Sequence, residues 1–156
     1  MTTLLYTHPA CLNHDTGRGH PERPERLGAV LDALGTSLFS ALDRREAPRA
    51  TLDQLTRVHD RGYAERVLSD VPPSGRIWLD PDTVISSGSG EAALRAAGAV
   101  CAAVDDVLQG VTDRAFCAVR PPGHHAEPSR AMGFCRTIPQ DDLCSQDATQ
   151  DLLGTT

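Results

Sequence analysis

Two adjacent histidines, His124 and His125, lie within the stretch RPPGHHAEPSRAMGFC at residues 120–135. An imidazole ordinarily has a pKa of about 6.5, so a pair of them can act as base and acid at neutral pH. Adjacent side chains on a regular strand point to opposite faces. Both rings can therefore face one pocket only if the backbone leaves strand geometry, which Gly123 makes easy. Taken alone, a His–His pair is more often two loop histidines without a catalytic role.

Hydrolysis of an unactivated amide also needs an activated water and a stabiliser for the developing charge, and a zinc ion supplies both. A catalytic zinc ordinarily has three protein ligands. One candidate ligand set in this chain is Cys117, His124, His125, Cys135 and Cys144. Its spacings match no common zinc motif, so a small metal-binding protein ranks last among the functions considered.

The elements that must position the histidines can be predicted from apolar periodicity. Residues 4–6 predict a short buried strand, and residues 11–24, dense in Gly, Pro and charge, predict a loop. A helix is expected from about Pro24 to a stop at Gly35. Its apolar positions are Leu27, Val30, Leu31 and Leu34. Thr51 and Gln54 form a candidate capping box for a short helix, and Asp60 is a candidate cap for the next.

A break at residues 71–75 precedes a segment, residues 76–90, that is expected to be a mostly extended loop. The longest helix is expected at residues 89–109, with one apolar stripe buried against a sheet and Asp105 and Asp106 outside. The stripe consists of Leu94, Ala97, Cys101, Val104 and Leu108. The alanine-rich composition with Gly98 in mid-helix predicts close packing against a sheet. A buried strand at residues 115–119 then leads into the histidine stretch, and this order predicts an α/β fold with a parallel sheet.

The composition excludes several classes of protein. The 156 residues suit one domain, and the net charge is −6. The arginines are spread along the chain, so no direct nucleic-acid binding is expected. Neither a signal-peptide pattern nor an apolar run of membrane length is present, so no membrane association is expected. The five cysteines, none spaced as C-x-x-C, favour reduced thiols in the cytoplasm.

The Pro, Gly, His and Phe positions of residues 120–135 together resemble the signature of the histone deacetylase family. The resemblance extends over residues 7–27, 55–67 and 79–100. It is to the bacterial members: histone-deacetylase-like amidohydrolases, acetylpolyamine amidohydrolases and acetoin-utilisation deacetylases. It implies the arginase/deacetylase α/β fold, a parallel sheet with flanking helices. It also implies zinc-dependent removal of acetyl from an amine, with acetyl-lysine or acetylpolyamine as the substrate partner, and it leaves the oligomeric state open.

The resemblance implies roles for single residues. His124 would be the general base towards the attacking water, and His125 would help as acid or electrostatic partner. Binding of the acylated amine would fall to Gly133, Phe134, His20, Pro21 and Arg23. The first two would line a narrow tunnel, the other three would form part of the pocket wall, and Arg23 would lie near the acetate exit. The histidines expected to be structural are His8, His14 and His59.

The chain departs from the family pattern after Cys135. The family continues into an Asp-x-Asp-x-His-His-type motif with zinc ligands, and then to a further Asp ligand and a transition-state Tyr. Residues 136–156 hold four Asp and no His. The expected domains are therefore the N-terminal part of a deacetylase domain at 1–135, incomplete at its C-terminal side, and a poorly ordered tail at 136–156. Zinc is expected for the full-length family, and no metal ligand is assigned in this chain.

Three hypotheses follow, in this order. The first is a truncated or frame-disrupted fragment of a zinc-dependent deacetylase, inactive on its own. The second is a non-catalytic binding module that keeps the substrate loop but has lost the metal. The third is the small metal-binding protein.

Overall fold

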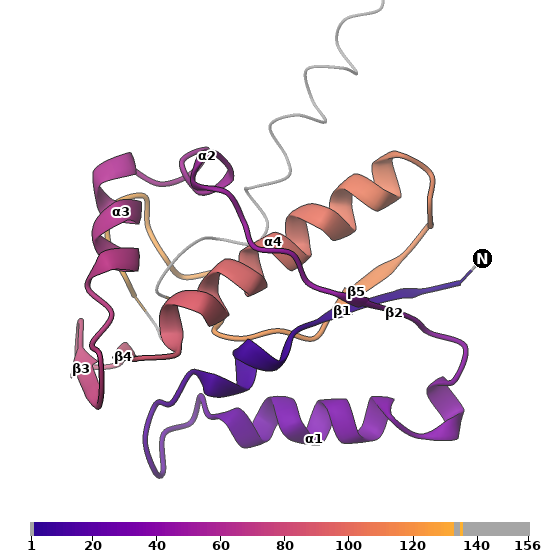
Figure 1. The fold of residues 1–156 in the computed structure, drawn as a ribbon, viewed down its shortest axis with the longest axis horizontal. Helices are drawn as coiled ribbons and strands as arrows, with labels where there is room; N and C mark the ends of the chain where they lie inside the picture. Colours follow the sequence, from indigo (N-terminus) through magenta and orange to yellow (C-terminus); the bar gives the residue numbers. More distant parts are fainter. Residues whose placement is uncertain (1, 133–134, 136–156) are drawn as a thin grey trace, which may run out of the picture.

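The computed structural model describes residues 2–132 and 135, and in this part a parallel sheet lies between two long helices (Figure 1). Helix α1 (Pro24–Leu34) covers one face of the sheet, and helix α4 (Ser89–Leu108) covers the other. Two shorter helices, α2 (Leu52–Leu55) and α3 (Arg61–Ser69), pack beside α4 together with a small hairpin. We call these smaller elements the lobe.

The sheet has β1 (Leu4–Thr7) in the middle, β2 (Asp43–Glu46) on one side and β5 (Ala115–Cys117) on the other. Both pairings are parallel, and Leu4 lies opposite Asp43 in one and Ala115 in the other. The predicted α/β fold with a parallel sheet and flanking helices is thereby confirmed. The buried strand predicted at 115–119 ends earlier, at Cys117, and is only partly buried, with Phe116 49% exposed. No strand was expected at β2, whose polar sequence DRRE forms a mostly exposed edge.

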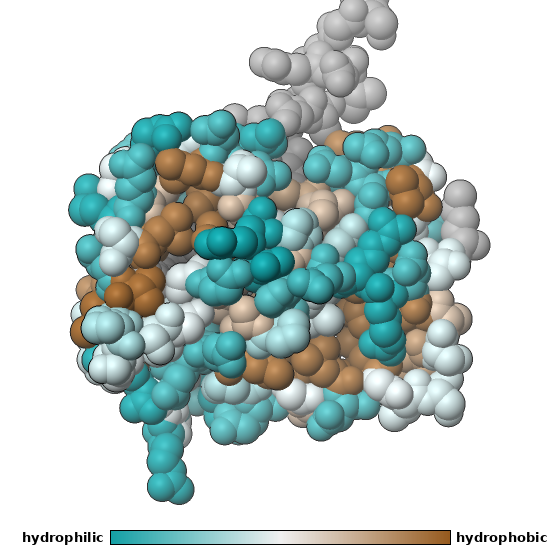
Figure 2. All heavy atoms as spheres, viewed as in Figure 1, coloured by the Kyte–Doolittle hydropathy of each residue, from teal (hydrophilic) through white to brown (hydrophobic). Residues whose placement is uncertain are grey.

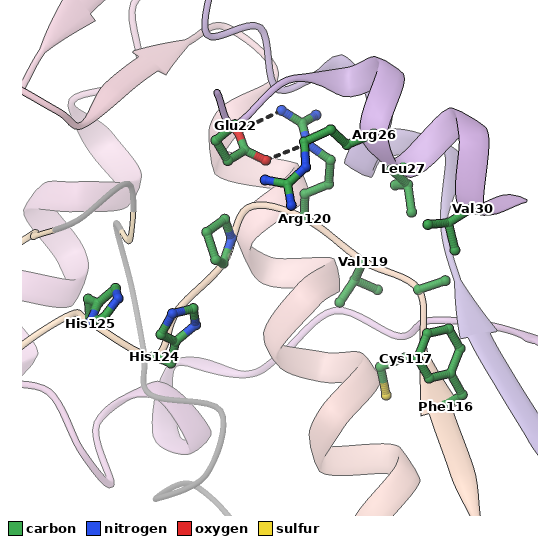
Figure 3. A pocket seen from close by; sticks show the side chains of 12 residues that line it. Glu22, Arg26, Leu27, Val30, Phe116, Cys117, Val119, Arg120, His124 and His125 are labelled. Carbon is green, nitrogen blue, oxygen red and sulfur yellow. Dashed lines mark hydrogen bonds and ion pairs between the residues drawn. The ribbon is translucent and has the colours of Figure 1, made fainter. Parts of the chain in front are cut away.

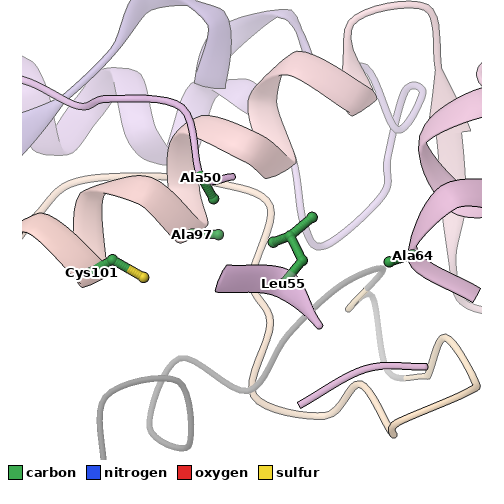
Figure 4. Packing of buried hydrophobic residues seen from close by; sticks show 5 residues of the cluster. All are labelled: Ala50, Leu55, Ala64, Ala97 and Cys101. Atoms are coloured by element: carbon green, nitrogen blue, oxygen red, sulfur yellow. The ribbon is translucent and has the colours of Figure 1, made fainter. Parts of the chain in front are cut away.

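Helix α4 presents different residues to the sheet and to the lobe. Ala99 and Ala103 pack against Leu4 and Tyr6 of β1. Two residues of the predicted stripe face the lobe instead, in a cluster of Ala50, Leu55, Ala64, Ala97 and Cys101 (Figure 4). The prediction that this stripe packs against the sheet was therefore wrong. The helix contacts the strands through alanines, whose small side chains allow a close approach.

The ends of the stripe also differ from the prediction. Leu108 is 61% exposed, and Leu94 is only half-buried against the lobe cluster. Asp105 is exposed as expected, but Asp106 accepts hydrogen bonds from the Tyr6 hydroxyl and, at 2.9 Å, from Arg45. The reason is length: at about 1.5 Å per residue α4 is about 30 Å long, whereas a four-residue strand spans about 13 Å. The last turn of α4 therefore extends beyond the strands.

Helix α4 packs closely at Gly98 as expected, but its partner there is not the sheet. A Cβ atom at this position would lie 2.1 Å from the carbonyl oxygen of Pro48 and 2.7 Å from the backbone nitrogen of Ala50. The backbone that α4 approaches is thus the segment just after β2, rather than a strand. No other residue type fits there without moving that backbone.

Helix α1 begins and ends where the sequence predicts, at Pro24 and before Gly35. Only Leu27 among its apolar residues is fully buried, in a cluster with Leu5, Cys11 and Ala118. Val30 is 40% exposed. The segment before α1, expected to be a loop, contains a short 3-10 helix, η1 (Pro9–Asn13), and a second one, η2 (Ser37–Phe39), follows α1.

The lobe shows one predicted cap and lacks another. Thr51 and Gln54 form the expected capping box at the start of α2. Asp60 precedes α3 as expected, but its side chain makes no capping hydrogen bond, so that part of the prediction was wrong. Where an extended loop was expected, β3 (Arg76–Trp78) and β4 (Val84–Ser86) pair as an antiparallel hairpin. β4 is buried, while β3 is exposed.

Large apolar side chains remain on the surface, and on the face in Figure 2 they lie in separate patches among polar residues. No helix among the described residues is long and apolar enough to cross a bilayer. The segment 136–156, predicted to be a tail, lies outside the described residues.

Candidate functional site

His124 and His125 are the two central residues of a tight turn that follows β5. The N–H of Ala126 donates to the carbonyl oxygen of Gly123 at 3.0 Å and closes this turn. The ring centroids of the two histidines are 4.2 Å apart, with ring planes inclined by 56°. Both side chains are exposed, and both line the same hollow. The backbone thus leaves strand geometry at the pair, as the sequence requires if both rings are to face one pocket.

The turn is the first of three in the segment that we call the histidine loop, residues 120–132 and 135. In the second turn, the N–H of Glu127 donates to the carbonyl of Arg130 at 2.9 Å. In the third, Met132 and Cys135 exchange two backbone hydrogen bonds of 3.0 and 2.9 Å. The loop is therefore held by its own backbone rather than by regular secondary structure.

Cys135 is fully buried against the histidine turn. Burial raises the pKa of its thiol, and hydrogen bonds from the backbone N–H groups of His125 and Ala126 offset part of that rise. The thiol accordingly supports the backbone of the turn. Sequence analysis considered Cys135 only as a metal ligand, since nothing local in the sequence shows that its sulfur meets these two amides.

The histidines stand at one end of a hollow of about 580 Å³ (Figure 3). Phe116 of β5 lies at the other end, and Leu27 and Val30 of α1 form a wall. The charged lining residues are Glu22, Arg26 and Arg120. An apolar hollow with two imidazoles at its end can hold an uncharged acyl group beside groups that transfer protons.

Cys117 also lines this hollow and is the only cysteine among its lining residues in the described part of the chain. Burial raises the pKa of its thiol to about 11. The thiolate is the nucleophilic form of cysteine, so Cys117 is a poor nucleophile at neutral pH. The chemistry that the site favours is acid–base catalysis by the histidines on water.

A buried ion pair fixes the start of the histidine loop. The Arg120 guanidinium donates to both carboxylate oxygens of Glu22, from Nε at 2.6 Å and from the second terminal nitrogen at 2.8 Å (Figure 3). Its remaining terminal nitrogen donates to the Cys11 carbonyl at 2.8 Å. Glu22 and Arg120 are 6% and 4% exposed. The two-point geometry sets the direction of the chain three residues before Gly123.

The network continues from Glu22 to the start of α4. His14 Nε2 lies 3.4 Å from the Glu22 carboxylate, and His14 Nδ1 lies 2.7 Å from the Ser89 hydroxyl. Burial would raise the pKa of Glu22, but the hydrogen bonds from His14 and Arg120 outweigh it and hold that pKa at about 2. Glu22 is therefore a permanent anion at neutral pH. His14, expected to be structural, belongs to this network.

The residues predicted to form the substrate wall lie in different places. His20 and Pro21 line a second hollow, together with Arg76 and Trp78. Arg23 is not among the lining residues of either hollow, and its guanidinium lies 3.9 Å from the Glu25 carboxylate. Gly133 and Phe134 lie outside the described residues.

Arg26, which sequence analysis did not select, lines the hollow of the histidines. Arg26 lies three residues, or about one helical turn, after Arg23. This spacing is the only feature of the sequence that could have pointed to Arg26 rather than Arg23 as a lining residue.

The described residues do not fit a zinc centre. No three His, Cys, Asp or Glu side chains within residues 2–132 and 135 come together so as to hold a metal ion. The candidate ligand set named above also includes Cys144, which lies outside the described residues. Its other members are Cys117, His124, His125 and Cys135.

Comparisons with known proteins agree on one family. A family model described as the histone deacetylase domain matches residues 20–137. A histone deacetylase-like amidohydrolase of Pseudomonas aeruginosa is 46% identical over 122 residues, which cover 75% of this chain and 31% of that protein. A probable deacetylase of Archaeoglobus fulgidus is 37% identical over 138 residues, covering 86% and 38%.

A comparison of structures indicates the same family. The crystal structure of the HDA15 HD domain superposes with a TM-score of 0.83 at 28% identity, over 94% of this chain and 44% of that chain. The chain thus spans about a third of the length of the two curated relatives and under half of this structure.

Proposed function

The chain belongs to the histone deacetylase family, and we propose that it forms the part of a deacetylase domain that carries the acid–base pair for hydrolysis of an acylated amine. The observation that carries this proposal is the turn that brings His124 and His125 together at the end of a largely apolar hollow. His124 takes the proton of the attacking water. His125 acts as the acid or electrostatic partner as the amine leaves.

Water rather than a protein side chain is the proposed nucleophile. The one thiol found in the hollow, that of Cys117, has its pKa raised to about 11 by burial. A covalent acyl–enzyme through this residue is therefore disfavoured. General acid–base catalysis contributes about 10²–10⁴-fold, which is too little for an unactivated amide.

We further propose that the complete reaction depends on zinc and that the 156-residue chain alone does not turn over. Zinc would supply water activation and charge stabilisation when bound. The family resemblance, in which the ligands follow the histidine stretch, supports the zinc dependence. No group of side chains within residues 2–132 and 135 could hold a metal ion, which supports the inactivity of the chain alone. The proposed substrates are acetyl-lysine in a peptide and an acetylpolyamine. By the family resemblance, Gly133 and Phe134 are the proposed tunnel residues and His20, Pro21 and Arg23 the proposed part of the pocket wall. None of these last three lines the hollow of the histidines.

The test is a chimera in which residues 1–135 replace the matching part of the Pseudomonas aeruginosa amidohydrolase. We expect zinc-dependent deacetylation of an acetyl-lysine peptide or an acetylpolyamine. His124→Ala in the chimera should lower kcat by about 10²–10⁴-fold. His8→Ala, a histidine outside the hollow, serves as the matched control. A folded chimera in which His124→Ala retains full activity would refute the proposed base.

The isolated chain forms the second arm of the same assay. With added zinc it should show no turnover above the His124→Ala variant. Zinc-dependent turnover that His124→Ala abolishes would instead mean that this chain builds a metal site by itself. Tight binding of the acylated amine by the isolated chain without turnover would favour the binding-module hypothesis.

We also propose a cytoplasmic location. The support is cysteine usage: within the described part of the chain, Cys11, Cys117 and Cys135 form no disulfide. Detection of this chain in a secreted fraction would contradict it.

A further inference from the structure

His59 is buried against the histidine loop, on the side away from β5. It lies between α2 and α3, and the residue is 4% exposed. Ring atom Nδ1 is 3.1 Å from the carbonyl oxygen of Pro128, and the backbone N–H of Asp60 donates to the same oxygen at 3.0 Å. Two donors from the α2–α3 junction thus converge on one carbonyl of the loop. Pro128 belongs to the turn that directly follows the histidine turn.

The partner of Nδ1 determines where the imidazole carries its proton. A carbonyl oxygen only accepts, so Nδ1 must be the N–H and Nε2 of the neutral ring has a bare lone pair. Nε2 is buried and has no hydrogen-bond partner in the described part of the chain. A second proton at Nε2 would bury a charged N–H without an acceptor, which costs far more than a buried lone pair.

The surroundings of the ring favour the neutral form. The facing groups are the carboxylate of Asp60, just before α3, and the ring of Tyr63 in α3, whose centroid is 5.3 Å away. From the loop they are the carbonyls of Pro128 and Glu127, and from α2 the buried, apolar Leu55, whose carbonyl accepts from the His59 N–H. Burial lowers the pKa of His59 against the opposite effects of those carbonyls and of Asp60.

We propose that neutral His59 is a positioning residue, which fixes the loop of His124 and His125 by donating from Nδ1 to the Pro128 carbonyl. The inference deepens the proposed function and rests on it only in assigning catalysis to the loop. Three attachments then hold the loop: Arg120 on Glu22 at its start, Pro128 on His59 in its middle, and Cys135 under the histidine turn. The middle attachment should weaken when His59 is protonated, because the charged ring would bury an Nε2–H without an acceptor.

The experiment measures amide hydrogen exchange at Ala126 and Glu127, whose N–H groups close the first two turns of the loop. Protection is expressed relative to Cys101 in α4, which removes the intrinsic pH dependence of exchange. Two variants are compared with the wild type. His59→Asn keeps an N–H donor near the position of Nδ1 and cannot be protonated, whereas His59→Leu keeps volume and loses the donor. His8→Asn is the control for a histidine away from the loop.

At pH 8 we expect wild type, His59→Asn and His8→Asn to protect both amides equally. In His59→Leu the protection factors of both amides should fall by about two- to tenfold, which corresponds to the loss of one hydrogen bond. Because burial lowers the pKa of His59 in the folded chain, the neutral form is favoured above about pH 6.5. Wild-type protection should therefore fall as the pH drops below that value, while that of His59→Asn stays constant.

Two results would overturn the proposal. One is wild-type protection in a folded His59→Leu variant, and the other is a wild-type profile that does not change between pH 8 and pH 5. If His59→Leu does not fold, the pH dependence of protection in the wild type and in His59→Asn still tests the proposal. The readout needs no activity, so an inactive chimera would count against the proposed function and leave this test intact.

Discussion

Glu22 and Arg120 are 98 positions apart in the sequence and form a buried ion pair with two hydrogen bonds. The pair joins the loop before α1 to the loop that carries the histidines. Glu22 has a second buried partner in His14, whereas the other described partner of Arg120 is the uncharged Cys11 carbonyl, so the guanidinium depends on Glu22 for its counter-charge. The two loops are therefore expected to be ordered or disordered together.

Glu22→Gln should destabilise the chain by about 3–5 kcal/mol, because it leaves the Arg120 guanidinium buried without its counter-charge. The pKa of Glu22 is about 2 in the folded chain, below its ordinary value of 4.5. The ion pair therefore contributes fully above about pH 4.5, and its contribution is lost as the pH falls towards 2. Urea unfolding at pH 7 and pH 3 should show the difference from wild type shrinking at the lower pH.

Glu25→Gln is the matched control for this change. Glu25 is 76% exposed and 3.9 Å from Arg23, so its substitution should alter stability by less than about 0.5 kcal/mol. Equal losses of stability from Glu22→Gln and Glu25→Gln would mean that the buried ion pair contributes no more than the exposed one.

Gly98→Ala and Gly28→Ala should have opposite effects on stability, although both lie inside helices. A Cβ at Gly98 collides with the Pro48 carbonyl, and forcing it in should cost about 1–3 kcal/mol. A Cβ at Gly28 meets nothing within 4 Å, and alanine there should stabilise α1 by about 0.5–1 kcal/mol. Thermal unfolding of the two variants tests the contrast, and a shift in the same direction for both would refute it.

Leucine-to-alanine substitutions should reduce stability more in the lobe cluster than at the surface. Leu55 is 1% exposed at the centre of the cluster, so Leu55→Ala should cost about 2–5 kcal/mol. Leu94 is only half-buried and should cost less. Leu38 is 82% exposed, and its substitution should stay within about 0.5 kcal/mol. Denaturant midpoints for the three variants give the order, and a Leu38 effect as large as that of Leu55 would contradict the assigned core.

The capping box at α2 gives a prediction about a single hydrogen bond. The Thr51 hydroxyl accepts from the Gln54 N–H at 3.1 Å, so Thr51→Ala should cost about 1 kcal/mol. Thr51→Ser keeps the oxygen and should restore most of the loss. Asp60 makes no such bond at α3. Its replacement by Ala should therefore cost less than Thr51→Ala in the same unfolding experiment.

Much of the fold can be predicted from the sequence because its helices carry local signals. Pro24 and Gly35 mark the ends of α1, and Thr51 with Gln54 marks the start of α2. The strand β2 carries no such signal, because its residues DRRE lie at the exposed edge of the sheet and show no apolar alternation. Its position depends on backbone pairing with β1, which becomes visible only in three dimensions.

The site can be predicted in part for the same reason. His124, His125 and Gly123 are neighbours in sequence, so the turn that presents both rings is a local inference. The partners that hold this turn are remote: His59 meets Pro128 across 69 positions, and Arg120 meets Glu22 across 98. A single sequence shows the charged and aromatic residues of such pairs, and it does not show which of them meet.

The order of the sheet has a consequence for synthesis on the ribosome. β1 is the first strand to emerge, yet it occupies the centre, and the Thr112 side chain just before β5 reaches back across 110 positions to the Thr2 carbonyl. At about 5–20 residues per second, one edge of β1 waits roughly 6–20 s for its partner. During that interval the nascent chain presents the apolar strand LLYT with an unpaired backbone. Conditions that slow translation between β2 and β5 should therefore increase the demand of this chain for chaperones.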